Sequence, residues 1–204
     1  MINNKQKIID AAFSLSVKKG FDNVSMKQIQ EESGLAIGSI YYHFENKDEI
    51  LDYLVKKYVL DSILIFTKEM RELDIPFIEK LKYVFSYKTD SFATKETFSE
   101  YSITRPAFDH KDLFAFNTSV FHHHPEIRHY FYEGHDKLFE LYYEMVEEAI
   151  ENGEVRDDID IKKTTILINT ALKGYTVLWV YIPELTLDEI VKANIEMIWN
   201  SIKK

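Results

Sequence analysis

The stretch that decides the fold, residues 25–51, reads SMKQIQEESGLAIGSIYYHFENKDEIL. Ser25 and Gln28 have capping-box spacing, which predicts that a short helix begins there. Gly34 ends that helix, and a second short helix is expected over about 36–43. Two short helices joined by a tight turn form a helix-turn-helix, whose second helix fits the major groove of DNA.

The second helix has the surface that such a role needs. Gly38 leaves its exposed face bare, so this helix can approach DNA closely. A run of hydrogen-bond donors follows, made of Ser39, Tyr41, Tyr42, His43 and Lys47. The alternative is a helical hairpin inside a core, but such a hairpin would not need a bare glycine beside these donors.

The same residues resemble the signature of the TetR family of transcriptional regulators. The resemblance covers about 8–51 and includes the run Gly38-x-Ile40-Tyr41-x-His43-Phe44-x-Asn46-Lys47-x-Glu49-x-Leu51, with Ala11-Ala12, Gly20-Phe21, Ser25 and Ile29 upstream. It implies an all-α fold of about nine or ten helices. Residues 1–46 would form a three-helix DNA-binding domain. Residues 47–204 would form a ligand-binding and dimerisation domain, with 47–70 as a connecting helix.

The resemblance also implies a function. The chain would be a ligand-responsive regulator, expected to be a repressor and not an enzyme. It would bind palindromic double-stranded operator DNA as a homodimer and be switched by an unknown small-molecule effector. The implied DNA-binding residues are Ser25, Met26, Lys27, Ala36, Ile37, Gly38, Ser39, Tyr41, Tyr42, His43 and Lys47. Ala36 departs from the family pattern, in which a capping Ser or Thr is common, so the recognition helix should lack a side-chain cap.

The charge of the chain opposes this function at first sight. The formal net charge is -9, whereas DNA-binding domains are usually basic. Within residues 1–50, however, six lysines oppose seven carboxylates, so the acidic excess lies mainly elsewhere. DNA binding should therefore depend on well-placed hydrogen bonds and on the avidity of a dimer rather than on a basic surface.

The rest of the chain is predicted to be helical. Apolar spacing and capping signals predict helices over 3–19, 47–70, 125–152, 161–182 and 186–202, with aromatic-rich helices of uncertain ends from 76 to about 124. The expected dimer face, low in specificity, is Leu138, Leu141, Tyr142, Met145, Leu167, Ala171, Gly174 and Leu178. The alternative is that these residues form a core within one chain.

Candidate ligand-binding residues are the least specific. The aromatic segment predicts either core packing or a pocket, for which we expect Tyr87, Tyr101, Phe121 and His122. Three consecutive histidines, 122–124, allow a metal or haem site, a pocket role or a helix-end role. A helical metalloenzyme built on Glu126 and His129 is the rival function, and a helical dimer without DNA binding is a third. Neither a cofactor nor a metal is assigned.

Composition limits the remaining classes. The chain has no cysteine, which excludes disulfides, thiolate metal sites and a cysteine nucleophile. It has neither a signal-peptide run nor an apolar stretch of about 18 residues. A soluble, cytoplasmic protein without a membrane partner is expected.

Overall fold

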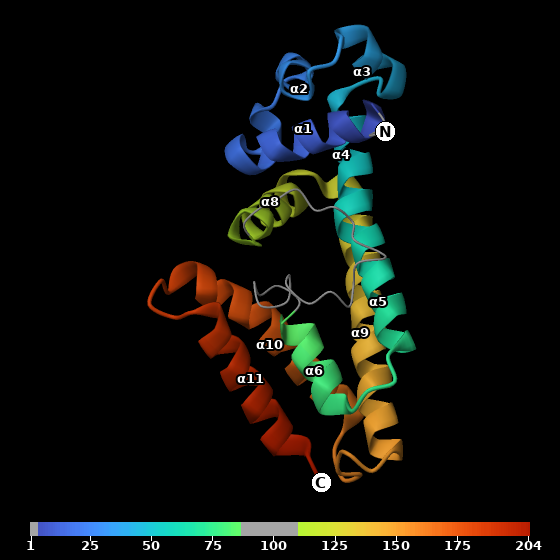
Figure 1. Ribbon diagram of the computed structural model, residues 1–204, viewed down its shortest axis with the longest axis vertical. Helices are drawn as coiled ribbons and strands as arrows, with labels where there is room; N and C mark the ends of the chain where they lie inside the picture. Colours follow the sequence, from blue (N-terminus) through green and yellow to red (C-terminus); the bar gives the residue numbers. More distant parts are fainter. Residues whose placement is uncertain (1–3, 87–109) are drawn as a thin grey trace. The chain divides into compact units, whose positions relative to one another are not determined.

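The computed structural model describes residues 4–86 and 110–204, and within these ranges the chain is helical apart from turns and one isolated bridge (Figure 1). The predicted all-α class is confirmed. The elements are α1 (Asn4–Lys19), a 3-10 turn η1 (Phe21–Asn23), α2 (Met26–Ser33), α3 (Ile37–His43), α4 (Lys47–Val55), a π-helical stretch η2 (Lys56–Asp61), α5 (Ser62–Glu72), α6 (Phe77–Ser86), α8 (His110–His123), a 3-10 turn η4 (Pro125–Ile127), α9 (Arg128–Glu151), α10 (Ile161–Tyr181) and α11 (Leu187–Ile202).

The helices pack into two units. Unit 1 comprises residues 1–63 and 103–134, and unit 2 comprises 64–102 and 135–204. Unit 1 therefore joins the N-terminal helices to α8 and to the first turns of α9. The expected functional division at residue 46 stays a prediction, because these units are defined by packing and not by activity.

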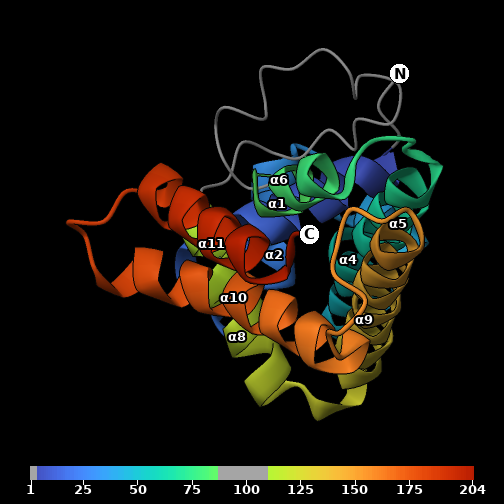
Figure 2. The ribbon, with the colours of Figure 1, turned by 90° about the horizontal axis from the view of Figure 1, so that it is seen from below.

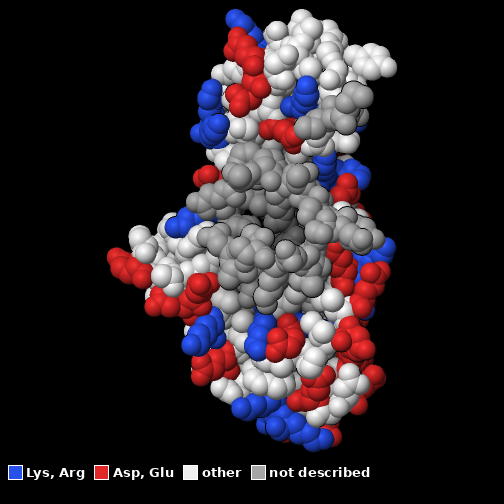
Figure 3. Space-filling view, in the orientation of Figure 1, with Lys and Arg blue, Asp and Glu red and all other residues white. Residues whose placement is uncertain are grey.

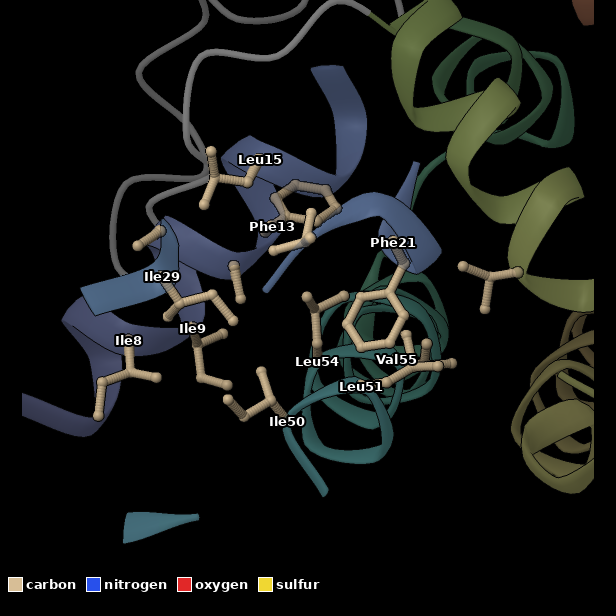
Figure 4. Close-up of a cluster of buried hydrophobic side chains, with 14 of the residues drawn as sticks. Ile8, Ile9, Phe13, Leu15, Phe21, Ile29, Ile50, Leu51, Leu54 and Val55 are labelled. Atoms are coloured by element: carbon tan, nitrogen blue, oxygen red, sulfur yellow. The ribbon is translucent and has the colours of Figure 1, made fainter. Parts of the chain in front are cut away.

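The core of unit 1 lies between α1, α4 and α8. Figure 4 shows the α1 side chains directed at the α4 side chains, and Ile8, Ile9 and Leu54 are fully buried there. Phe116 of α8 meets Phe13 edge-on, with ring centroids 5.3 Å apart. Burying an aliphatic or aromatic side chain of this size stabilises a fold by about 1.5–3 kcal/mol. The helix-turn-helix is therefore attached to a packed hydrophobic core.

The predicted helix ends of unit 1 are confirmed. The Ser25 hydroxyl accepts from the Gln28 amide at 3.2 Å, and the Gln28 side chain accepts from the Ser25 amide at 2.9 Å. Gly34 ends α2 in the left-handed conformation, with φ 66°. Asn46 caps α4 by accepting from the Glu49 amide at 2.9 Å. These local bonds fix where the two short helices stop and start.

The connecting helix is more complex than expected. It continues to Glu72, but six residues, Lys56–Asp61, are π-helical. Such a stretch is rare and often lies at functional positions. The stretch carries Tyr58, whose ring stacks on Phe13 at 4.8 Å and whose hydroxyl donates to Asp10 of α1 at 2.6 Å. The π-helical stretch η2 thus takes part in the contact between α1 and the connecting helix.

Unit 2 is built around α6, α9, α10 and α11, and Figure 2 shows α11 running beside α10. Its core includes Phe85 of α6, Val146 of α9 and Tyr175 of α10, all at most 2% exposed. The predicted start of the helix near residue 186 is confirmed, because Thr186 and Glu189 form a capping box at the start of α11. On the face drawn in Figure 3, acidic and basic side chains are interspersed over this unit.

Candidate nucleic-acid interface

The short helix α3 presents one face to solvent and buries the other. Ile40 is fully buried and Phe44, directly after the helix, is 2% exposed, so both hold α3 on the core. Ala36 begins the helix with an extended backbone, and no side-chain cap appears within the described structure, as the sequence predicts. The helix is therefore positioned by packing beneath it rather than by its cap.

The outward face of α3 is apolar and aromatic. Tyr42 is 84% exposed, Tyr41 53% and Ile37 40%. A Cβ added at Gly38 would meet no heavy atom of the described residues within 4 Å, so the helix backbone is open to solvent there. Exposed large apolar side chains gathered on one surface indicate a contact surface. The expected bare face beside Gly38 is present.

Two polar residues of α3 have partners within the chain. The Asn4 amide donates to the Ser39 hydroxyl at 3.3 Å, which links the start of α1 to the middle of α3. The half-buried His43 ring meets the Tyr42 ring edge-on at 5.0 Å. On α2, Lys27 is well exposed, and its ion pair with Glu31 is long at 3.9 Å. Lys27 is therefore available to an anion, and Met26 beside it packs partly on the core.

Lys47 has a role that the sequence did not reveal. Its ammonium donates to the backbone carbonyls of Phe21 and Asp22, both at 3.2 Å, and lies 4.7 Å from the centre of the Phe21 ring. These contacts of Lys47 link the start of α4 to η1. The expected contact between Lys47 and a phosphate would compete with these bonds and stays a prediction.

The other side of η1 is held by His124. Its Nε2 lies 3.1 Å from the Asp22 carboxylate and its Nδ1 lies 3.1 Å from the Glu126 carboxylate. The pKa of Glu126 is held below its usual value, chiefly by its own backbone amide and also by His124. This contact joins the end of α8 to η1, 102 residues away in sequence.

The neighbouring histidines have local partners. His123 Nδ1 lies 3.0 Å from the Ser119 carbonyl, and His129 Nδ1 lies 3.0 Å from the Glu126 carbonyl. His129 therefore contacts the backbone of Glu126, while the Glu126 carboxylate contacts His124. Within the described ranges no group of three or more His, Asp or Glu could hold a metal ion. These contacts favour the helix-end interpretation of the histidine run.

The predicted ligand residues are not brought together by the described structure. Tyr87 and Tyr101 lie outside the described residues. Phe121 is half-buried and packs edge-on against Phe131 at 5.5 Å, and His122 is exposed. Their role in ligand binding stays a prediction.

The predicted dimer residues divide into two groups. On α9, Leu141, Tyr142 and Met145 are at most 5% exposed because they pack inside the core of unit 2. This burial fits the alternative of a core within one chain, and a place for these residues in an interface stays a prediction. Leu138 is half-buried against the same core. Burial by the chain itself explains the apolar stripe of α9.

On α10, two of the predicted dimer residues are exposed rather than buried. Leu167 is 47% exposed and Leu178 43%, and a Cβ at Gly174 would meet nothing described within 4 Å. With Ala171, these residues have spacings of four, three and four, which place them on one helix face. On that face Leu167 and Leu178 are exposed, while Ala171 packs partly against the core of unit 2. Among the described helices, none combines the length and the hydropathy that a membrane span requires.

Comparisons with known proteins agree with this geometry. Residues 8–54 match the sequence family described as bacterial regulatory proteins, tetR family. The chain is 25% identical, over 83% of its length, to an HTH-type transcriptional regulator of Staphylococcus aureus strain bovine RF122 / ET3-1, of which the match spans 78%. It is 30% identical over 69 residues to a regulator of the same type from strain USA300. That match covers 34% of this chain and 37% of the relative.

Solved structures share the fold over nearly the whole chain. A putative transcriptional regulator from Saccharomonospora viridis, in complex with choline, has a TM-score of 0.76 at 17% identity and covers 98% of this chain and 97% of its own. The regulator FadR from Bacillus subtilis, in complex with stearoyl-CoA, has a TM-score of 0.69 at 21% identity and covers 96% and 98%. The family match at the helix-turn-helix and the α3 geometry lead to one conclusion: residues 8–54 form a helix-turn-helix module of the kind found in the tetR family of bacterial regulatory proteins.

Proposed function

We propose that the chain is a homodimeric repressor that binds palindromic double-stranded operator DNA through α3 and is switched by a small-molecule effector. The observation that carries the proposal is the outward face of α3. It exposes Ile37, Tyr41 and Tyr42 beside an open Gly38, while Ile40 fixes the helix from below. A core hairpin would have no reason to hold three large apolar side chains in solvent.

The contacts with DNA divide by residue type. Lys27 and the hydroxyls of Ser25, Tyr41 and Tyr42 are expected to meet phosphates, which position a protein on the duplex without reading sequence. The start of a recognition helix faces base edges. Ala36 and Ile37 therefore lie where sequence is read, and Gly38 allows the backbone to come close.

The proposed dimer uses the open face of α10. Leu167, Ala171, Gly174 and Leu178 form a strip of apolar and small residues on one helix face. On α11, Met197 is a further large apolar side chain, 71% exposed. A strip with a bare glycine at its centre suits close approach of an identical helix, because a two-fold interface pairs the same patch on both copies. A second copy of the chain is thus the occupant that we propose for this face.

Dimerisation gives the proposal its operator geometry. Two copies of α3 related by a two-fold axis would read two inverted half-sites about 34 Å apart, one turn of DNA. The fold neighbours bound to choline and to stearoyl-CoA support an effector site in the helical remainder. An effector would act by binding one conformation more tightly, which shifts the population away from the DNA-competent state. We propose no catalytic step.

Selection of DNA from a random pool tests the proposal. We expect an inverted repeat, and failure to enrich any sequence would contradict DNA-specific binding.

The dimer is tested separately by sedimentation of two variants. Leu178→Glu puts a charge on the open face of α10 and should yield monomers. Lys162→Glu, at an exposed position of the same helix outside the strip, should stay dimeric. Equal masses for both variants would show that the strip is not the interface.

A further inference from the structure

The base-reading surface of α3 has an unusual composition. Residues Ile37–His43 include no Lys, Arg, Asn, Gln, Asp or Glu. Guanine is usually read by Arg or Lys, adenine by Asn or Gln, and cytosine by an acidic side chain. On the face shown in Figure 3, the α3 end of unit 1 likewise carries mostly uncharged side chains. The paired hydrogen bonds that specify most bases therefore cannot come from α3.

Polar groups next to α3 are already used. The Asn4 amide and the Ser39 hydroxyl are bonded to one another. The Gln28 side chain is held in the capping box of α2. The Lys47 ammonium is bonded to the two carbonyls of η1. Each would have to give up a contact before it could read a base.

What remains at the start of α3 is apolar. Ile37 is the first helical residue and is 40% exposed, Ala36 before it is exposed, and Gly38 after it adds no side chain. In the major groove, thymine alone of the four bases presents a methyl group. An exposed isoleucine beside a bare glycine can reach that methyl group, because nothing on the helix keeps it at a distance.

We propose that Ile37, with Ala36 beside it, reads thymine 5-methyl groups, so that each half-site holds thymine opposite the start of α3. This inference rests on the proposed function, in which α3 enters the major groove. Ile37 is then a specificity-determining residue, and the operator is read by apolar contact. Each methyl group removed from water contributes roughly 0.8 kcal/mol, which corresponds to about a fourfold change in affinity.

The test uses the operator obtained by selection, with single thymines replaced by deoxyuridine, which lacks only the methyl group. For the unaltered protein we expect about a fourfold loss of affinity at one or two positions in each half-site, and about sixteenfold when both half-sites are changed. Ile37→Ala should bind the thymine operator less tightly and be insensitive to deoxyuridine at those positions.

Lys27→Ala is the matched control, because loss of a phosphate contact weakens binding to all sequences. It should lower affinity and keep the full deoxyuridine effect. An operator that binds specifically but tolerates deoxyuridine at every position would overturn the inference and leave the proposed function standing. Absence of specific DNA binding would instead refute the proposed function. Circular dichroism of Ile37→Ala should match the parent, because the side chain is exposed.

Discussion

Gly38→Ala should make the protein more stable and a weaker DNA binder. The φ angle of Gly38 is not positive, so alanine can adopt its backbone conformation. The added Cβ would meet nothing described within 4 Å. Replacing a helical glycine by alanine gains about 0.5–1 kcal/mol, and the lower end applies because Gly38 is only the second residue of α3. The melting temperature should rise by about 1–2 °C.

The same methyl group would stand between α3 and the DNA. Inserting a methyl group into a packed contact costs about 1–3 kcal/mol. Operator affinity should therefore fall by a factor of about 5 to 150 for each half-site that α3 contacts. Fluorescence anisotropy with a labelled operator measures the affinity, and thermal unfolding by circular dichroism measures the stability.

Asp136→Ala is the control for this experiment. Asp136 is exposed on α9, and alanine there also improves helix propensity, by roughly 0.6 kcal/mol. This variant should gain similar stability and keep its operator affinity. If Gly38→Ala bound the operator as tightly as the parent, the close approach of α3 to DNA at Gly38 would be refuted.

Three further predictions concern stability. Glu148→Ala should destabilise unit 2 by about 2 kcal/mol in urea unfolding, because it leaves the ammonium of Lys80, only 6% exposed, without its 2.7 Å partner. Lys80→Met should destabilise unit 2 by less than Glu148→Ala does, since it removes the buried charge itself. Thr186→Ala should cost about 1 kcal/mol through loss of the α11 cap, and an unchanged urea midpoint would contradict it. Burial raises the pKa of Tyr175 to about 12. The stability that the buried, neutral Tyr175 gives to the fold is therefore complete below about pH 10 and is lost as the pH rises to about 12. Between pH 9 and pH 11 the free energy of unfolding should fall by about 1 kcal/mol more for the parent than for Tyr175→Phe, and equal falls would refute this.

Features encoded by neighbouring residues could be predicted from the sequence. The capping box at Ser25, the helix end at Gly34, the helix start at Thr186 and the uncapped start of α3 at Ala36 were all predictable. Each depends on residues at most four apart, so the local pattern contains the whole physical cause. The outward face of α3 followed because its buried positions have helical spacing.

Contacts between distant segments could not be predicted in the same way. No local pattern indicates that His124 would bridge to Asp22, or that Lys47 would bond to the carbonyls of η1. The six-residue π-helical stretch also escaped prediction, since residues of ordinary helix propensity form it. The apolar stripe of α9 shows a further limit. Periodicity indicates that a face is covered, but not whether the same chain or a second copy covers it.

The composition of unit 1 has a consequence for the order in which the protein forms during synthesis. Its core needs Phe116, Val120, Ile127 and Phe131 packed against the N-terminal helices, and within unit 1 these residues are synthesised last. At about 5–20 residues per second, some 70 residues after Ile63 take roughly 4–14 s to emerge. A nascent chain thus carries its complete DNA-reading sequence well before the support for that sequence exists. Competence to bind an operator should therefore arise only after about two thirds of the polypeptide has been translated.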